Sequence, residues 1–532
     1  MTDRARNPWG WGFAEAVIDG AAAQAVAAGT RSLLGFGAEE PEQPVPTVAA
    51  RLAEPRLPLP PGRLGEICTQ ESAARAGHAY GRSYLDVVRA LRGRYDHLPD
   101  VVAFPRHEAD VAELLEWAEL VNAAVVPYGG GTSVVGGVEP RLPGRFAGAL
   151  TIDLSRLDRV LEIDPVSRAA RIQAGASGPR LEEQLRQAGL TLRFYPQSFE
   201  LSTLGGWLAT RASGHYATRL THIDDVVESI RAITPVGEWQ SRRLPGSGAG
   251  PSPDRMLLGS EGILGVITEA WVRVRPRPSF RASRSVRFPS FLTGADAVRA
   301  VVQSGLDPAN CRLLDPLEAA QTGSGDGHHA VLVLGFESAD HPVDGLLDIA
   351  LALCSTHGGS WDDTSGDPAR GDVGSGDATE GAWRSAFLQM PYLRDLLLRL
   401  GVLSDTFETA ITWDRFPAFH AAVVGATRAS LGEPSRVSCR FSHVYPDGPA
   451  LYYTVLAPVA RGAEEERWHQ MKRAASDAIL AAGGTITHHH AVGRDHREWY
   501  DAQRPEPFAA ALRAAKGAVD PAGRLNPGVL VD

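Results

Sequence analysis

The sequence predicts an α/β or α+β fold, because short apolar runs alternate with amphipathic helical segments from about residue 100 onward. The chain has 532 residues, which suggests two to four domains, since a domain typically holds roughly 100–200 residues. Hydrophobic residues make up 44% and charged residues 22% of the chain, which is ordinary globular composition and argues against extended disorder.

Before residue 100 we expect two helices joined by a proline-rich connector. Residues 14–28 are rich in alanine with few helix breakers, and residues 85–94 have apolar positions at helical spacing. Between them, PEQPVP (41–46) and PRLPLPPG (55–62) favour extended chain.

Strands and helices alternate over most of the remaining chain. Up to residue 278 we expect strands at 101–104, 123–127, 150–154 and 170–174, and helices at 110–122 and 179–188. From 279 to 480 the alternation continues, for example with a strand at 330–336 and a helix at 344–357, and a last helix is expected at 506–518. Residues 358–381 are a polar low-complexity stretch, for which a mobile loop is favoured over a lid.

Composition excludes several classes of function. The net charge of 53 − 63 = −10 gives no electrostatic footprint for nucleic acid or an anionic membrane. No window contains 18 consecutive apolar residues, and the N-terminus lacks the apolar core of a signal peptide. Cys68, Cys311, Cys354 and Cys439 lie far apart without zinc-ligand spacing, which is typical of a cytoplasmic protein without disulfides.

Three Gly/Ser/Thr-rich segments, each next to an apolar strand, fit one extended ligand with many polar atoms. In PYGGGTS (127–133), three successive glycines let backbone N–H groups converge on an anion, and Thr132 and Ser133 add hydroxyls. The others are STLGGWLATRASG (202–214) and GSEGILGVIT (259–268). A pyrophosphate can be held in this way without lysine, and only two lysines are present in the chain.

These segments resemble the FAD-binding domain of the vanillyl-alcohol oxidase (PCMH-type) flavoprotein family. Within it, the chain is similar to the alkyldihydroxyacetonephosphate synthases, which make ether lipids. WGWG (9–12), HIDDVVESIRAITPVG (222–237), YLRD (392–395), FETAITWDR (407–415) and HHHAVG (488–493) extend the resemblance over nearly the whole chain.

The resemblance implies an α+β protein of four parts. These are a helical N-terminal extension (1–99), a PCMH-type FAD-binding domain of two α+β subdomains (100–277), a cap domain with an antiparallel sheet and helices (278–500), and a C-terminal segment that returns to the flavin domain (501–532). Family members with covalent FAD often carry a histidine where Thr132 stands, so we expect non-covalent FAD. The expected FAD-binding residues are Pro127, Gly129, Gly130, Gly131, Thr132, Ser133, Ser202, Thr203, Gly205, Gly206, Arg211, Ser213, Gly214, Glu261, Gly262, Gly265, Val266 and Ile267.

A run of three histidines is the first candidate for catalysis. Adjacent side chains on extended chain point to opposite faces, so we expect His488, His489 and His490 not to converge on a metal ion. In the family this run lines the substrate face of the flavin and supplies acid–base groups, a task that suits neutral imidazole.

Two further residues match family positions. Tyr452 aligns with the active-site tyrosine, whereas Tyr453 alternates to the other face of the strand. Arg394 matches an arginine that contacts substrate and can bind a carboxylate or phosphate bidentately. Arg312, Arg440 and His443 are weaker candidates, because nothing local separates them from structural roles.

The resemblance implies an FAD enzyme that exchanges the acyl group of acyl-dihydroxyacetone phosphate for a fatty alcohol through a flavin N5 adduct. The alternative is an FAD-dependent oxidase or dehydrogenase of a 2-hydroxy acid or another alcohol, with hydride transfer to N5. An arginine that the synthases carry just before GSEG is missing from 244–254, where only Arg243 or Arg255 could replace it, and this favours the alternative.

Expected partners are a small-molecule or lipid substrate and no nucleic acid. A peripheral membrane contact and a homodimer stay open. The arginine-rich composition is typical of a bacterial protein, and we expect it in the cytoplasm.

Overall fold

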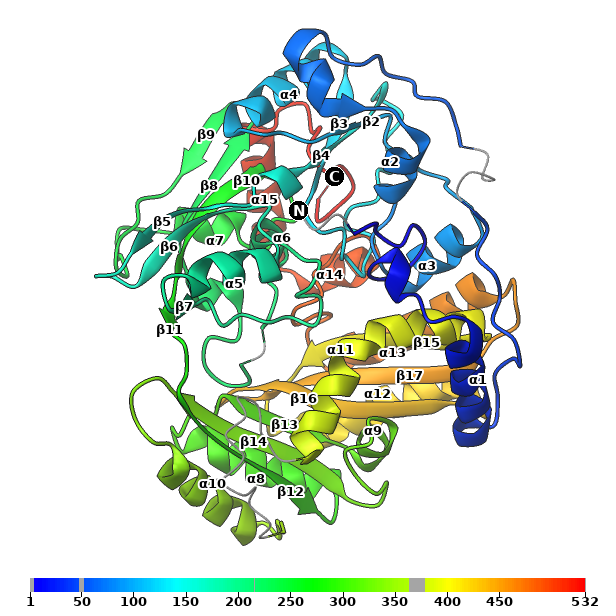
Figure 1. The fold of residues 1–532 in the computed structure, drawn as a ribbon, viewed down its shortest axis with the longest axis vertical. Helices are drawn as coiled ribbons and strands as arrows, with labels where there is room; N and C mark the ends of the chain where they lie inside the picture. The colour runs from blue at the N-terminus through cyan, green and yellow to red at the C-terminus, as the bar shows by residue number, and fades with distance from the viewer. Residues whose placement is uncertain (1–3, 47–51, 215, 363–377, 532) are drawn as a thin grey trace.

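The computed structural model describes residues 4–46, 52–214, 216–362 and 378–531 (Figure 1). Most of the polar stretch predicted as a loop or lid (358–381) falls outside the described residues, and helix α11 (Ala378–Arg399) begins at its end. Among the described residues, no helix combines the length and apolar character needed to cross a bilayer.

The first subdomain, which precedes residue 154, is a four-stranded sheet in the order β1-β2-β4-β3. Strands β2 (Val101–Ala103), β4 (Gly148–Asp153) and β3 (Ala123–Tyr128) are parallel, and β1 (Cys68–Thr69) is antiparallel to β2. Helix α4 (Glu108–Leu120) connects β2 to β3 and buries Val111, Leu114 and Leu115. Parallel strands carry their binding loops at their carboxyl ends, which places the glycine loop directly after β3.

The second subdomain is a five-stranded antiparallel sheet in the order β5-β6-β10-β8-β9. Its strands are β5 (Val160–Asp164), β6 (Ala169–Gln173), β8 (Val227–Thr234), β9 (Gly237–Gln240) and β10 (Val266–Arg273). Helices α5 (Gly178–Arg186), α6 (Leu204–Thr210) and α7 (Pro253–Leu257) contact this sheet. Strand β7 (Leu190–Thr191) pairs with β11 (Arg275–Pro276) in a separate two-stranded sheet. Buried side chains of both subdomains form one continuous hydrophobic core.

The cap is a six-stranded antiparallel sheet in the order β12-β14-β13-β16-β17-β15. The strands are β12 (Phe280–Phe288), β13 (Asn310–Leu314), β14 (Ala330–Ser338), β15 (Val402–Ala410), β16 (Arg436–Val444) and β17 (Pro449–Pro458). Helices α8 (Phe291–Gln303), α10 (Asp344–Thr356), α12 (Phe416–Leu431) and α13 (Glu464–Ala481) share a core with one sheet face. Helices α9 (Pro316–Gln321) and α11 lie against the other face (Figure 1).

Two chain ends tie the halves together. The N-terminal segment carries α1 (Gly20–Leu34), which packs on α11 and β15, and is followed by α2 (Ser72–Gly77) and α3 (Tyr84–Leu91). At the other end, α14 (Arg497–Gln503) and α15 (Glu506–Val519) lead back to the flavin domain, where Val125 of β3 exchanges backbone hydrogen bonds of 2.8 Å with Arg524 and Asn526.

WGWG and YLRD, two motifs far apart in the sequence, contact each other. The carboxylate of Asp395 accepts the backbone N–H of Trp11. A Cβ at Gly10 would collide with Asp395, and one at Gly12 would collide with the ring of Tyr392. The glycines therefore allow the N-terminal segment to lie directly on α11.

The predicted α+β class is confirmed, with an antiparallel cap sheet covered by helices. The helix predicted at 14–28 is shifted: residues 14–16 form a short 3-10 turn, and α1 runs from Gly20 to Leu34. The backbone near Ala14 is held instead by its hydrogen bond to Ala5, and α1 ends at Gly35, whose φ is 79°. Alanine content raises helix propensity but does not set a boundary.

Candidate active site

A cavity lies between the glycine loop and the face of the cap sheet that carries Tyr452 and Arg440. It encloses about 1570 Å³ of space free of protein atoms, part of it open to solvent. Its lining comes from the glycine loop, the segment at 202–214 and the cap sheet, so a ligand bound in it contacts both halves of the protein.

The glycine loop forms one wall of the cavity, and its shape requires glycine. A Cβ at Gly129 would collide with the hydroxyl of Thr203, and one at Gly130 would collide with the carbonyl of Leu201. Gly131 has φ 64°, in the left-handed region. The absence of side chains lets the loop lie directly against the segment before α6, so backbone groups face the cavity.

The segment at 202–214 forms the adjoining wall. Thr203 caps α6 by accepting the N–H of Gly206, and the indole N–H of Trp207 donates to Ser202 at 2.7 Å. These bonds fix the two polar residues beside the glycine loop. Gly205 faces away, because a Cβ there would meet Ala174 of the sheet.

The GSEG segment supports the cavity from behind. The carboxylate of Glu261 accepts the N–H groups of Val492 and Gly493 at 2.9 and 2.8 Å, and burial raises the pKa of this group to about 7. Gly262 lies against Pro127, where an added Cβ would be 3.0 Å from the ring. This segment therefore links the glycine loop to the chain that follows the three histidines.

The structure brings only some of the expected FAD-binding residues to the cavity surface. Those that line it are Gly129, Gly130, Gly131, Thr132, Ser133, Ser202, Thr203, Gly206, Ser213 and Gly214. Outside the lining are Pro127, Gly205, Arg211, Glu261, Gly262, Gly265, Val266 and Ile267. Arg211 pairs with Asp224 at 2.7 Å, and Val266 and Ile267 lie within β10.

The cap sheet contributes Tyr452 to the opposite wall. Its hydroxyl is 3.0 Å from the hydroxyl of Thr406, and the Arg440 guanidinium lies 4.0 Å above its ring centroid. Burial raises the pKa of Tyr452, which keeps the phenol protonated. Tyr453 points to the helix layer, where it stacks on Phe407 and lies 3.2 Å from His420.

Three arginines reach the cavity from different elements. Arg394 of α11 donates to the backbone carbonyl of Arg82 at 2.8 Å and to Asp395 at 3.0 Å. Arg440 of β16 is paired with buried Glu318. Arg312 of β13 is 3% exposed, and burial together with Arg440 lowers its pKa to about 9, which leaves it charged at neutral pH.

The three histidines are held by one buried carboxylate. Glu408 on β15 accepts the backbone N–H groups of His488, His489 and His490, the last two at 3.2 and 2.9 Å, and also the hydroxyl of Thr487. Burial alone would raise the pKa of Glu408, but the neighbouring imidazoles and the Thr487 hydroxyl outweigh burial and hold it below its usual range.

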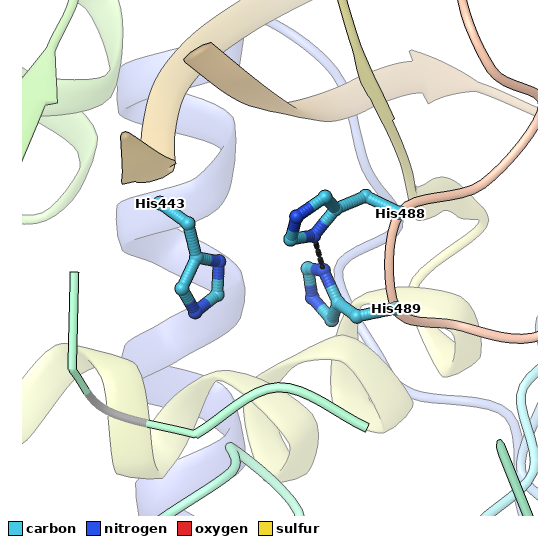
Figure 2. A group of neighbouring side chains, drawn as sticks. All are labelled: His443, His488 and His489. Atoms are coloured by element: carbon cyan, nitrogen blue, oxygen red, sulfur yellow. Dashed lines mark hydrogen bonds between the residues drawn. The ribbon is translucent and has the colours of Figure 1, made fainter. Parts of the chain in front are cut away.

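The expected alternation of histidine side chains does not occur. The chain bends at residues 488–490, and the Nδ1 atoms of His488 and His489 lie 2.9 Å apart (Figure 2). His489 and His490 line the cavity beside Tyr452, whereas His488 lies behind them, 2.8 Å from the hydroxyl of Tyr445. Burial lowers the pKa of all three imidazoles, so they are neutral at pH 7.

Sequence reasoning missed Glu408 and ranked Arg312, Arg440 and His443 as weak, although the last three line the cavity. Arg312, Arg440 and His443 lie on strands with no local motif, and strand pairing brings them together. Glu408 lies in FETAITWDR, but nothing in that motif marks it as the anchor of the histidines. The arginines considered near GSEG do not replace the missing one: Arg243 pairs with Glu228 and Asp164, and Arg255 pairs with Asp224.

Comparison with known proteins identifies the family. The model of an FAD binding domain matches residues 99–241, and that of the C-terminal domain of FAD linked oxidases matches residues 277–530. The alkyldihydroxyacetonephosphate synthases of Dictyostelium discoideum and Caenorhabditis elegans are 30% and 31% identical over 481 and 490 residues, each 87% of this chain and 78% and 81% of those proteins. The chain belongs to the alkyldihydroxyacetonephosphate synthase family.

Solved structures agree with this assignment. A crystal structure of alkyldihydroxyacetonephosphate synthase matches with a TM-score of 0.80 and 25% identity, covering 98% of this chain and 97% of that one. A p-cresol methylhydroxylase has the same fold, with a TM-score of 0.70 at 15% identity over 88% of this chain and 95% of that one. More distant in sequence is the D-lactate dehydrogenase (cytochrome) of Arabidopsis thaliana, 25% identical over 82% of this chain and 74% of that protein.

The residues present fit the FAD that this family binds. Three successive glycines line the cavity at a place where any Cβ would collide with neighbouring protein atoms, and hydroxyls beside the loop come from Thr132, Ser133, Ser202 and Thr203. This donor set suits a pyrophosphate and its ribose groups.

Proposed function

We propose that the protein exchanges the acyl group of an acyl-dihydroxyacetone phosphate for a fatty alcohol, giving an alkyl ether. One observation carries the proposal: the cavity beside the glycine loop is lined on its cap side by Tyr452, Arg394, His489 and His490 together, the residues that match the synthase pattern. When bound, FAD supplies the reactive ring at which this exchange takes place.

The imidazoles and the phenol have different roles in this proposal. His489 and His490 are neutral, so either can accept the proton that leaves C1 of the substrate. Tyr452 is protonated, so it donates a hydrogen bond to a substrate oxygen. At pH 7 the imidazoles are therefore in the form that accepts a proton and the phenol is in the form that donates one.

The arginines bind the anionic end of the substrate. Arg394 and Arg312 are charged and face the same cavity, and guanidinium groups bind phosphate oxygens bidentately. Arg312 thus adds a second positive charge at the cavity, which the segment before GSEG does not supply. Apolar contacts with the fatty chain come from Trp11, Met390 and Pro391 at the same cavity.

The test is product mass after incubation of the purified flavoprotein with palmitoyl-dihydroxyacetone phosphate and hexadecanol under nitrogen. We expect the alkyl ether without any electron acceptor. Tyr452→Phe should lower turnover at least tenfold, whereas Tyr453→Phe, which removes a hydroxyl from the other face of the same strand, should not. Absence of ether, with reduction of the flavin by a 2-hydroxy acid, would establish the oxidoreductase alternative instead.

We propose several further properties of the protein. FAD is bound non-covalently, since Thr132 stands in the glycine loop, and acid precipitation should release all flavin into the supernatant. The division into 1–99, 100–277, 278–500 and 501–532, a cytoplasmic location, a homodimer and a peripheral membrane contact stay predictions.

A further inference from the structure

Three imidazoles from two distant segments converge beside the cavity. His443 ends β16, and His488 and His489 lie in the bend after α13. Each offers a ring nitrogen, and these nitrogens lie within 4.8 Å of one another. Figure 2 shows the His488 and His489 rings facing each other, with His443 opposite them. The three nitrogens are near enough for one metal ion to bind all of them after small rotations of the rings.

Hydrogen bonds leave a ring nitrogen of His443 available as a ligand. Its Nε2 is 3.0 Å from the carbonyl of Gly214, which can only accept, so Nε2 carries the proton and Nδ1 presents its lone pair. The hydroxyl of Ser442, 3.1 Å from Nδ1, is a competing donor that can rotate away.

The pair formed by His488 and His489 needs a cation or a proton between its nitrogens. Two Nδ1 lone pairs 2.9 Å apart repel each other unless one of these lies between them. The Nε2 of His488 is 2.8 Å from the hydroxyl of Tyr445 and 3.2 Å from Nε2 of His222. The hydroxyl of Tyr445 lies 3.0 Å from that of Thr221 and can donate to it, so Tyr445 can accept the Nε2 proton of His488. Nδ1 of His488 then carries a lone pair that can bind a metal ion.

The surroundings supply charge and rigidity. Glu408 fixes the histidine segment through its backbone, and its carboxylate lies 3.6 Å from Nδ1 of His489. A buried negative charge at this distance favours a cation and opposes the nearby positive charge of Arg312.

We propose that His443, His488 and His489 bind one divalent transition-metal ion of the zinc type. Three nitrogen ligands leave a fourth position open, and His443 and His489 line the cavity, so that position faces the bound substrate. There the ion polarises a carbonyl or hydroxyl oxygen as a Lewis acid. With His489 bound to the ion, His490 is the base of the proposed reaction. Metal binding itself does not depend on which reaction the flavin site performs.

Zinc retention tests this proposal on the intact flavoprotein. The purified protein is treated with a chelator, loaded with Zn²⁺, passed through a desalting column and analysed for zinc and flavin by elemental analysis and absorbance. We expect one zinc per chain. His443→Gln keeps a side-chain N–H for the Gly214 carbonyl but removes the imidazole, and should weaken Zn²⁺ binding by about 100-fold or more.

His490→Ala is the matched control, because it removes the neighbouring imidazole that is outside the cluster. We expect this variant to keep its zinc while it loses turnover. Both variants are compared at equal flavin content and melting temperature, which excludes misfolding as the cause. The proposal is overturned if the wild type loses its zinc on the column, or if His443→Gln retains as much zinc as the wild type.

Discussion

Replacement of Glu408 by glutamine tests whether one carboxylate holds the histidine segment. Oε2 accepts the N–H of His488, while Oε1 accepts the N–H groups of His489 and His490 and the hydroxyl of Thr487. Glutamine keeps the volume, but its NH₂ group must face at least one of these donors whichever way the amide turns. One hydrogen bond is lost, and the other three no longer involve a charged acceptor.

The expected loss follows from these bonds. A hydrogen bond to a charged group contributes about 1.5–3 kcal/mol and a neutral one about 0.5–1.5 kcal/mol, and a buried donor left without an acceptor adds a desolvation cost. We expect the free energy of unfolding to fall by about 2–4 kcal/mol. Urea unfolding of the holoprotein, followed by far-UV circular dichroism and flavin fluorescence, measures this change.

Glu466→Gln provides the control, because Glu466 lies exposed on α13 and surface changes are usually within about 0.5 kcal/mol. If Glu408→Gln unfolds at the same urea concentration as Glu466→Gln, the carboxylate does not hold the segment and the reasoning is wrong. The pH dependence gives a second check. The pKa of Glu408 is lower in the folded protein than its ordinary value of 4.5. The ionised carboxylate therefore stabilises the fold fully above pH 4.5, and this stabilisation is lost as the pH falls below 4.5 toward the folded pKa.

Three other outcomes are expected. Gly130→Ala should weaken FAD binding at least tenfold by fluorescence titration, since its Cβ would collide with a backbone carbonyl, whereas Gly517→Ala, with open space around it, should not. Arg312→Gln should raise KM for the phosphate-bearing substrate about tenfold or more, and Arg243→Gln should leave it unchanged, because only the first residue lines the cavity. The pKa of Glu261 is raised to about 7 in the folded protein, so its protonated form contributes stability that is lost as the pH rises from 4.5 to about 7. Glu261→Gln should therefore reduce the pH dependence of the free energy of unfolding in urea over that interval.

Local patterns predicted the flavin-binding half well. The glycine loop, the segment before α6 and GSEG are each continuous in sequence, so their composition alone indicates turns with exposed backbone donors. Sequence did not separate residues that contact the cavity, such as Thr203, from residues that hold the turn in place, such as Glu261. Both kinds occur in the same short motifs, and only packing distinguishes them.

The cap half of the site was harder to predict because its residues come from different strands. Arg312, Arg440 and Tyr452 lie on β13, β16 and β17, and register places Arg440 opposite both Leu314 and Tyr452. Alternation along one strand indicates which residues share a face, but it does not indicate which strands are neighbours. The missing information is the order of the strands in the sheet. On one side β13 pairs with β14, which follows it in sequence, but on the other side it pairs with β16, which comes much later in the chain.

The three histidines show how a distant charge can override a local rule. On extended chain, successive side chains point to opposite faces of the strand and successive N–H groups point to opposite edges. Three successive N–H groups that converge on one carboxylate are incompatible with that geometry, and they form the kind of concave backbone site that binds anions. Glu408, 80 residues before His488, supplies this anion. The bend that it stabilises turns His488 and His489 toward each other, so the carboxylate that anchors the histidine segment also places two of the three imidazoles of the proposed metal site.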